Sequence, residues 1–450
     1  MMQNRAAALF TSEGFDLWDI YKEKSTITSI TFDNKKIDKI STGIDEGTGL
    51  RALKNNKTLF AYTNSPEKEY EIAKTFVSNF NEKEINFSLI TPDKIHPIKI
   101  SPETVDINKK IDLLKKIDDR ARAADDKIKQ VTVTYSEKIQ DIEIINDLGL
   151  YMKEKRIYTS LIIFIVGVDA GKIETAHSVI SGLCGFEILD DKLIERKVDD
   201  IVKLVLQLLS TDKKIMGEMP VVISSEAGGT MIHEAVGHSL EADQVEKKLS
   251  IYNREMIGKK VASDVVSVID DPTQPNKRGS YSFDDEGIKA VRKILIENGI
   301  LKDFIYDREN ALKHNVKSNG GGRRESYRFR PIPRMSNTYV ISGKGNPDDL
   351  IKDTKKGLFV RKMGGGQVNT VTGEFIFDVK EGYIIEQGKI TYPVRDATLL
   401  GKGSDVLFSI DAVCSDFGID VGTCGKDGQG VPVSDGLPTL RIAKFLVGSK

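Results

Sequence analysis

Residues 27–62 read ITSITFDNKKIDKISTGIDEGTGLRALKNNKTLFAY and decide the fold class of the first part of the chain. Short runs rich in Ile, Thr, Leu and Phe alternate here with turn signals at Asp33-Asn34 and Asn55-Asn56. The runs that we interpret as strands are residues 27–32, 36–42, 49–53 and 58–62. Because short strands separated by such turns are typical of hairpins, the sequence predicts an antiparallel sheet.

The remainder of this first part mixes helical and strand patterns. Apolar residues recur at helical spacing within residues 105–126 and 194–209, which predicts two amphipathic helices. Further strand-like runs occupy residues 129–135, 140–146, 151–160 and 161–168. The polar stretch that follows the second helix predicts a domain boundary at about residue 210. We therefore expect residues 1–210 to form an N-terminal α+β domain with an antiparallel sheet.

Residues 211–450 form the second expected domain. They are β-rich and punctuated by glycine clusters, namely GGGRR at 320–324, GGGQ at 364–367 and the tail at 418–436. Glycine clusters without a phosphate-loop pattern are typical of tight turns and close backbone approach. The sequence thus predicts an α+β protein of two domains, with a C-terminal β-rich domain that carries the histidine helix described below.

Composition excludes several classes of partner. The 66 Lys and Arg residues nearly cancel the 67 Asp and Glu residues, so the net charge of -1 gives no general attraction to nucleic acid. The longest apolar run, LIIFIVGV at 161–168, is far shorter than the roughly 20 residues of a membrane helix. Because the N-terminal MMQNRAAALF lacks the apolar core of a signal peptide, we expect a cytoplasmic location without a membrane partner.

The stretch GGTMIHEAVGHSLEAD at 228–243 carries two of the five histidines and is close to a zinc-peptidase signature. In that signature the histidines are four residues apart, whereas His233 and His238 are five apart. On a regular α-helix such a pair lies about 140° apart, and the pair would then be one buried and one exposed histidine. A π-bulge, or a helix that ends at Gly237, would instead bring the two rings together. A regular α-helix through Gly237 would exclude a metal site, for which Glu234 could supply the base.

A catalytic zinc site needs about three protein ligands and an open position. Glu241 and Asp243 follow the histidines and are oxygen donors. Among the three cysteines, Cys184 and Cys414 lie in apolar surroundings and resemble small core residues. Cys424 lies in VGTCGKDGQG, which we interpret as an exposed glycine loop, and this favours Cys424 as the third ligand.

The chain resembles the TldD/PmbA family of metallopeptidases, and within it the metal-bearing type of subunit. The segments that carry the resemblance are GIDEGTGLRAL at 43–53, GTMIHEAVGHSLEAD at 229–243, RGSYSFDDEG at 278–287, LIENGILKDF at 295–304, GGRRESYRFRPIPRMSNTYV at 321–340, GGGQVNTVTGEFIF at 364–377 and TCGKDGQGVPVSDGLPTL at 423–440. Together they span nearly the whole chain. Two departures are Ser434-Asp435, where the family commonly has Gly-Val, and Arg395-Asp396, where Lys-Gly is usual.

The resemblance implies a site and a reaction. His233, His238 and Cys424 would bind Zn²⁺, and Glu234 would be the general base that activates zinc-bound water. A set of two imidazoles and one thiolate also favours zinc over magnesium or calcium. The expected activity is hydrolysis of unfolded or linear peptides. The expected assembly is a homodimer, or a heterodimer with a TldE/PmbA-like subunit.

Two other interpretations remain open. The first is a non-catalytic assembly or regulatory protein, in which Glu241 or Asp243 completes a closed structural metal site. The second is a gyrase-modulating role suggested by older family naming, against which the balanced charge argues. Substrate orientation and oxyanion stabilisation have three candidates in the sequence, Arg323, Arg324 and His314.

Overall fold

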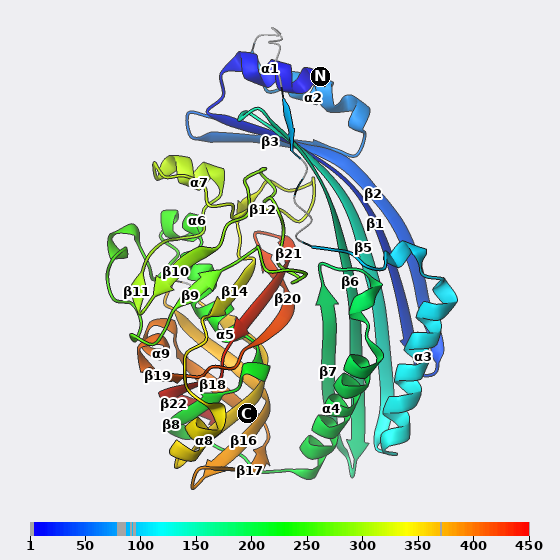
Figure 1. Ribbon diagram of the computed structural model, residues 1–450, viewed down its shortest axis with the longest axis vertical. Coiled ribbons are helices and arrows are strands. Elements are labelled where there is room, and N and C mark those ends of the chain that lie inside the picture. Colours follow the sequence, from blue (N-terminus) through cyan, green and yellow to red (C-terminus); the bar gives the residue numbers. More distant parts are fainter. Residues whose placement is uncertain (1–3, 79–86, 91, 93–95, 370, 450) are drawn as a thin grey trace.

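The computed structural model describes residues 4–78, 87–90, 92, 96–369 and 371–449. Two parts lie side by side (Figure 1). A sheet of long strands from the first part of the chain runs along one side, and the part that follows residue 210 packs against it. The last helix of the first part ends at Ser210 and the next strand begins at Gly217, while the division into two domains at residue 210 stays a prediction.

The first sheet is antiparallel, as expected, apart from one short parallel strand at its edge. Its strands are β1 (Leu17–Asp33), β2 (Lys36–Lys54), β3 (Lys57–Thr63), β4 (Ser88–Ile90), β5 (Ile128–Asn146), β6 (Leu150–Asp169) and β7 (Lys172–Gly182). They pair in the order β3-β2-β1-β5-β6, and both β7 and the parallel strand β4 pair with β6.

The strands are longer than the sequence predicts. The expected strands at 129–135 and 140–146 are one strand, β5, and those at 151–160 and 161–168 are likewise one strand, β6. The polar residues between the two runs of β5 do not break the ladder because their side chains have partners on the sheet or on the helix that covers it. Glu137, for example, is buried and accepts a hydrogen bond from Lys110 Nζ at 2.7 Å.

Within the described residues, four helices cover one face of this sheet (Figure 1). They are α1 (Arg5–Glu13), α2 (Glu69–Lys74), α3 (Ile107–Ala124) and α4 (Asp191–Ser210), with the 3₁₀ turns η1 (Pro66–Lys68), η2 (Pro102–Thr104) and η3 (Phe186–Ile188). Helices α3 and α4 confirm the two amphipathic helices predicted from periodicity. Strand alternation divides the faces: Trp18 and Ile20 pack in the cluster that contains α1, whereas Tyr21 packs against Phe283 and Tyr327 of the second part. No helix among the described residues has both the length and the apolar character needed to cross a membrane.

The second part is β-rich, as expected. Strands β8 (Gly217–Ile223), β15 (Lys356–Val368), β16 (Glu374–Glu386), β18 (Ala397–Lys402) and β22 (Leu440–Ser449) pair in a closed ring, to which β17 (Lys389–Val394) and β19 (Ile410–Val413) attach. A separate sheet has the order β11-β10-β9-β14-β21-β20. Its strands are β9 (Val268–Asp270), β10 (Lys293–Glu297), β11 (Ile300–Leu301), β14 (Asn337–Val340), β20 (Gly418–Lys426) and β21 (Gln429–Leu437).

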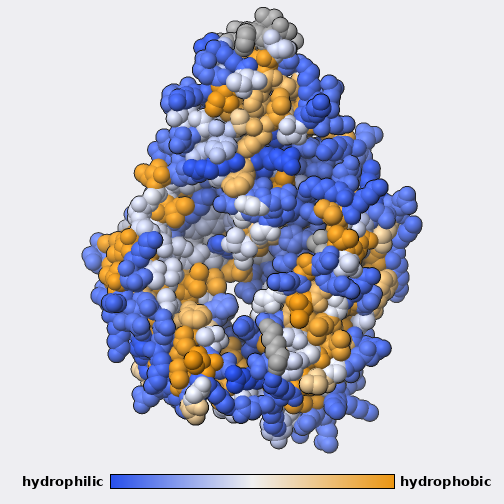
Figure 2. All heavy atoms as spheres, turned by 180° about the vertical axis from the view of Figure 1, so that it is seen from behind, coloured by the Kyte–Doolittle hydropathy of each residue, from blue (hydrophilic) through white to orange (hydrophobic). Residues whose placement is uncertain are grey.

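Short elements connect these sheets. Strands β12 (Gly322–Arg323) and β13 (Ile332–Pro333) form a two-stranded pair. The helices are α5 (Thr230–Ile232), α6 (Ala242–Glu246), α7 (Arg308–Lys313), α8 (Pro347–Asp353) and α9 (Gly403–Ser409). Two 3₁₀ turns are η4 (Ser225–Ala227) and η7 (Arg254–Met256). A cavity of about 430 Å³ separates α4 and β7 from β15 and β20. Seen from behind, the molecule is hollowed between its two parts (Figure 2).

Candidate metal centre

The backbone through HEAVGH departs from an α-helix, as the spacing of the histidines requires. Helix α5 is followed by a π-helical turn, η5 (His233–Gly237), and then by a 3₁₀ turn, η6 (His238–Leu240). The His238 N–H donates to the His233 carbonyl, five residues back. The wider turn brings the two imidazole rings to a centroid separation of 5.0 Å at 88°. The prediction of an irregular helix is therefore confirmed.

Gly237 lies at the end of this turn, where a side chain would meet Met335. A Cβ atom at residue 237 would lie 2.0 Å from Sδ of Met335, a side chain that is fully buried. The absence of a side chain thus lets the π-turn approach the segment that precedes β14. The glycine acts through packing rather than through the helix end that the sequence offered as an alternative.

Cys424 reaches the histidines from a strand and not from an exposed loop. It lies on β20, opposite Val431 of β21, and only 5% of its surface is exposed. The expectation of a glycine loop was wrong because the turn is confined to Asp427 and Gly428, whose φ values are 50° and 75°. An Asp-Gly pair with two positive φ values is the signal of a tight hairpin turn, and it was present in the sequence.

The three side chains lie together. Within the described ranges, His233, His238 and Cys424 form a group in which one potential ligand atom of each residue lies within 4.8 Å of the others. The Cys424 Sγ lies 3.3 Å from His238 Nε2. The buried Nδ1 of His233 has no hydrogen-bond partner and lies 3.9 Å from Asp435 Oδ2. Two imidazoles and a thiol converging in a buried site fit the nitrogen and sulfur preference of zinc.

Charge at the site favours a thiolate. Burial raises the pKa of the Cys424 thiol, but hydrogen bonds from His233 and His238 outweigh burial and lower that pKa to about 5. Burial lowers the pKa of His238, whereas the charge of Glu241 and the contact with Cys424 raise it well above its ordinary value. The deprotonated sulfur is the form that binds metal.

Glu241 and Asp243 lie beside the three donors and are bonded to other side chains. Glu241 Oε2 lies 2.9 Å from His238 Nδ1, on the side of the ring opposite the nitrogen that faces Cys424. Lys426 Nζ donates to Glu241 at 3.0 Å and to Asp243 at 2.6 Å. Both carboxylates are thus engaged, and neither belongs to the group of three donors. Lys426 was not singled out from the sequence, although it lies two residues after Cys424.

Glu234 lies at the edge of the site. Its Oε2 is 4.0 Å from His238 Nε2, and 29% of its side chain is exposed, compared with 12% for His238. The carboxylate is therefore close to the donors and open to water. This position suits a general base, which must be close to the proton that it removes.

The three candidates for substrate orientation have other contacts. His314 Nε2 pairs with Glu246 at 2.8 Å, and Arg324 Nη2 donates to Asp19 at 2.7 Å. Arg323 donates to the carbonyls of Met335 and Pro432.

An arginine that the sequence did not single out contacts the cysteine strand directly. The fully buried Arg334 donates to the Cys424 carbonyl through Nη2 and so fixes the strand that presents the sulfur.

Comparison with known proteins finds similarity over nearly the whole chain. The family models described as PmbA/TldA metallopeptidase domain 1, central domain and C-terminal domain match residues 18–76, 100–209 and 216–449. The chain is 36% identical to a metalloprotease TldD homolog of Haemophilus influenzae, with 98% of this chain and 94% of the relative covered. It is 30% identical to a zinc metalloprotease TldD homolog of Saccharolobus solfataricus, with 93% of each covered.

Solved structures share the fold. A putative modulator of a DNA gyrase from Thermotoga maritima superposes with a TM-score of 0.80 at 24% identity, covering 99% of this chain and 98% of the other. TldE from Thermococcus kodakarensis superposes with a TM-score of 0.77 at 19% identity, covering 98% and 99%.

Proposed function

The chain belongs to the PmbA/TldD metallopeptidase family, and from that membership we propose that it is a zinc-dependent peptidase acting on unfolded or linear peptides. In this proposal His233, His238 and Cys424 hold the metal and Glu234 is the general base. The observation that carries it is the convergence of these three donors within 4.8 Å, with a partly exposed carboxylate beside them.

Each residue has a defined task in the proposed reaction. When bound, zinc supplies Lewis acidity that polarises the scissile carbonyl and makes water more acidic. Glu234 takes a proton from the attacking water and delivers it to the leaving amine. Glu241 holds the His238 ring so that Nε2 faces Cys424. Lys426 balances the charge of Glu241.

Two features favour this role over a closed structural metal site. Glu241 and Asp243, the candidates for a fourth ligand, are bonded to His238 and Lys426 instead. Three protein ligands leave a position for substrate or water, as in catalytic zinc sites.

Burial limits the substrate. His233 and Cys424 are 4% and 5% exposed, so a scissile bond must enter the protein to reach them. An extended chain can do so, whereas the surface of a folded protein cannot. We also propose that the chain works as a homodimer or with a TldE/PmbA-like subunit.

The test compares Glu234→Gln and Cys424→Ser with the wild-type chain, by metal analysis and by digestion of an unfolded protein and of its folded form. Glu234→Gln should keep its zinc, while its rate of peptide hydrolysis should fall by roughly 10²- to 10⁴-fold. Cys424→Ser should lose both zinc and activity. The proposal fails if Glu234→Gln retains zinc and digests at the wild-type rate. If the wild-type chain is inactive alone, the same comparison is made with a TldE-like subunit added.

A further inference from the structure

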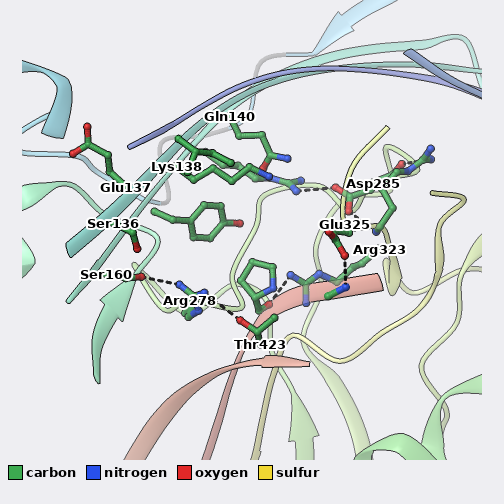
Figure 3. A pocket seen from close by; sticks show the side chains of 16 residues that line it. Ser136, Glu137, Lys138, Gln140, Ser160, Arg278, Asp285, Arg323, Glu325 and Thr423 are labelled. Atoms are coloured by element: carbon green, nitrogen blue, oxygen red, sulfur yellow. Dashed lines mark hydrogen bonds and ion pairs between the residues drawn. The ribbon is translucent and has the colours of Figure 1, made fainter. Parts of the chain in front are cut away.

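A second candidate site, a partly open cavity, lies between the two parts of the molecule (Figure 3). This cavity of about 240 Å³ is bounded by Lys138 and Gln140 of β5 on one side. Thr423 and Pro432 of the β20–β21 hairpin bound the other side, together with Arg278 and Arg323. Successive residues of a strand point to opposite faces, so Thr423 faces this cavity while Cys424 faces the histidines. The cavity is therefore distinct from the metal centre.

Arg278 enters the cavity without an acidic partner. Its Nη1 donates to the hydroxyls of Ser160 and Ser181 at 3.1 and 2.6 Å, and its other donors meet the Gly422 carbonyl and the Thr423 hydroxyl. Every one of these partners is neutral. Figure 3 shows the guanidinium bridging Ser160 of β6 and Thr423 of β20.

Arg323 likewise donates hydrogen bonds only to neutral groups. It is 3% exposed, and its guanidinium donates to the carbonyls of Met335 at 2.5 Å and Pro432 at 2.7 Å. Burial lowers the pKa of Arg278, and the nearby positive charge of Arg323 lowers it further. Two like charges thus share a partly buried cavity, an arrangement that an anion would stabilise.

The acidic residues of the cavity do not supply that anion. Asp285 pairs with Arg156 at 2.7 Å, and Glu137 pairs with Lys110 at 2.7 Å. Glu325 accepts a hydrogen bond from the Gly430 N–H.

Donors remain unused around the same space. Arg324 lines the cavity, is 4% exposed, and keeps Nε and Nη1 buried without a hydrogen-bond partner. The Tyr158 hydroxyl, also in the lining, has no hydrogen-bond partner within the described part of the chain.

We propose that this cavity is an oxyanion-binding site in which Arg278 and Arg323 hold a carboxylate or phosphate group, with Arg324 and Tyr158 as further donors. Guanidinium groups bind both oxyanions by charge and by N–H donors. Arg278 supplies mainly its charge, because four of its N–H groups already meet protein acceptors. Each Nη of Arg323 donates to one carbonyl and so keeps a second N–H for the anion. The volume is below the roughly 300 Å³ at which pockets for drug-sized ligands begin, so it suits a small ion or a single acidic group. The anion comes either from solution, as inorganic phosphate, or from the C-terminal carboxylate of a peptide.

The test is calorimetric titration of the full-length chain with inorganic phosphate at constant ionic strength, and of the double variant Arg278→Gln/Arg323→Gln. Wild type should bind one phosphate per chain, and the double variant should bind it at least roughly tenfold more weakly. Phosphate should also raise the melting temperature of wild type but not of the double variant. This comparison within each protein separates lost binding from lost stability. Arg120→Gln, which changes an exposed arginine between α3 and α4, is the control and should bind phosphate as wild type does.

Two further arms identify the source of the anion and exclude the metal centre. If the natural ligand is a peptide end, a short peptide with a free C-terminal carboxylate should displace phosphate, whereas the same peptide with a C-terminal amide should not. If neither peptide displaces phosphate, the natural ligand is the free ion. Binding should persist after chelation, since the cavity does not involve the three metal donors. Absence of saturable phosphate binding by wild type, equal binding by the double variant, or loss of binding on chelation would overturn the proposal.

Discussion

At the scale of single residues, Glu241 connects the two segments that form the candidate metal centre. It is fully buried, and its carboxylate contacts His238 of the π-turn region and Lys426 of the β20–β21 hairpin. Burial raises its pKa, but the charges of Lys426 and His238 outweigh burial and hold that pKa well below its ordinary value. Glu241 is thus an anion that fixes which nitrogen of His238 faces Cys424.

We expect Glu241→Gln to weaken zinc binding by roughly 10- to 100-fold, because a neutral amide supports the imidazole less well than a carboxylate does. Zinc affinity is measured by competition with a chromophoric chelator. Glu246→Gln is the matched control, since Glu246 makes the same kind of bond to His314 outside the group of metal donors. Equal zinc affinity of Glu241→Gln and wild type would show that Glu241 does not support the centre.

Asp307 makes stability depend on pH. Burial, together with the nearby charge of Glu286, raises its pKa from 3.8 to about 7. The folded chain therefore binds more protons than the unfolded chain between these values, so this group's contribution to stability is full below about pH 4 and is lost as pH rises to 7. Asn at this position keeps a cap acceptor for the Asn310 N–H but does not titrate.

Asp307→Asn should consequently be more stable than wild type at pH 8 and similar at pH 4, with a difference on the order of 1 kcal/mol or more. Urea denaturation across this pH range measures the free energy of unfolding. Asp190→Asn changes the exposed N-cap of α4, and its free energy of unfolding should vary with pH as that of wild type does. If the free energy of unfolding of Asp307→Asn varies with pH as that of wild type does, Asp307 is not the source of the pH dependence.

At the scale of elements, the π-turn and the β20–β21 hairpin each place part of the candidate metal site. The π-turn aligns histidines that an α-helix would separate, and the tight turn at Asp427 and Gly428 returns β21 beside the strand that carries Cys424. Gly237 makes the π-turn depend on its surroundings, because Met335 fills the space beside it.

Gly237→Ala should destabilise the chain by about 1 to 3 kcal/mol, since the added methyl overlaps the Met335 side chain. The double variant Gly237→Ala/Met335→Ala should recover part of this loss, because the smaller side chain at 335 gives the methyl room. Denaturant titration of the two single variants and the double variant yields the coupling free energy. Simple additivity of the two effects would show that the overlap with Met335 is not the cause.

At the scale of the whole molecule, buried ion pairs join the first sheet to the second part. Arg51 of β2 lies opposite Asp19 of β1 and also binds Glu286 at 2.5 Å, and all three side chains are fully buried. Arg324 binds Asp19 from the second part at 2.7 Å. The face of the sheet that is turned away from the helices is therefore held by charge as well as by apolar contacts.

Arg51→Met should destabilise the chain by about 3 to 5 kcal/mol, because it leaves the carboxylates of Asp19 and Glu286 buried with less compensation. Denaturant unfolding followed by both fluorescence and circular dichroism measures the change. Arg120→Met removes an exposed pair with Asp199 and should cost about 1 kcal/mol or less. If both substitutions have the same small effect, the buried pairs do not stabilise the docking of the two parts.

Local patterns predicted much of the architecture. Helical spacing located α3 and α4, and short β-runs with Asn and Asp turns indicated the antiparallel sheet. The full length of β5 was not predicted, because the polar residues between its two expected runs find partners only when the sheet is covered. Glu137, which bonds to Lys110 of α3, is an example.

The sequence by itself determined that His233 and His238 could meet only on an irregular helix, because residue spacing along a helix fixes the direction of each side chain. Tertiary structure alone decided how Cys424, which is 186 residues from His238 in sequence, approaches the histidines. It also decided that Glu241 meets Lys426 and that Arg278 and Arg323 share a cavity. Such contacts depend on how separate sheets pack against each other. Local periodicity indicates which face of an element is buried, but it does not indicate which residues cover that face.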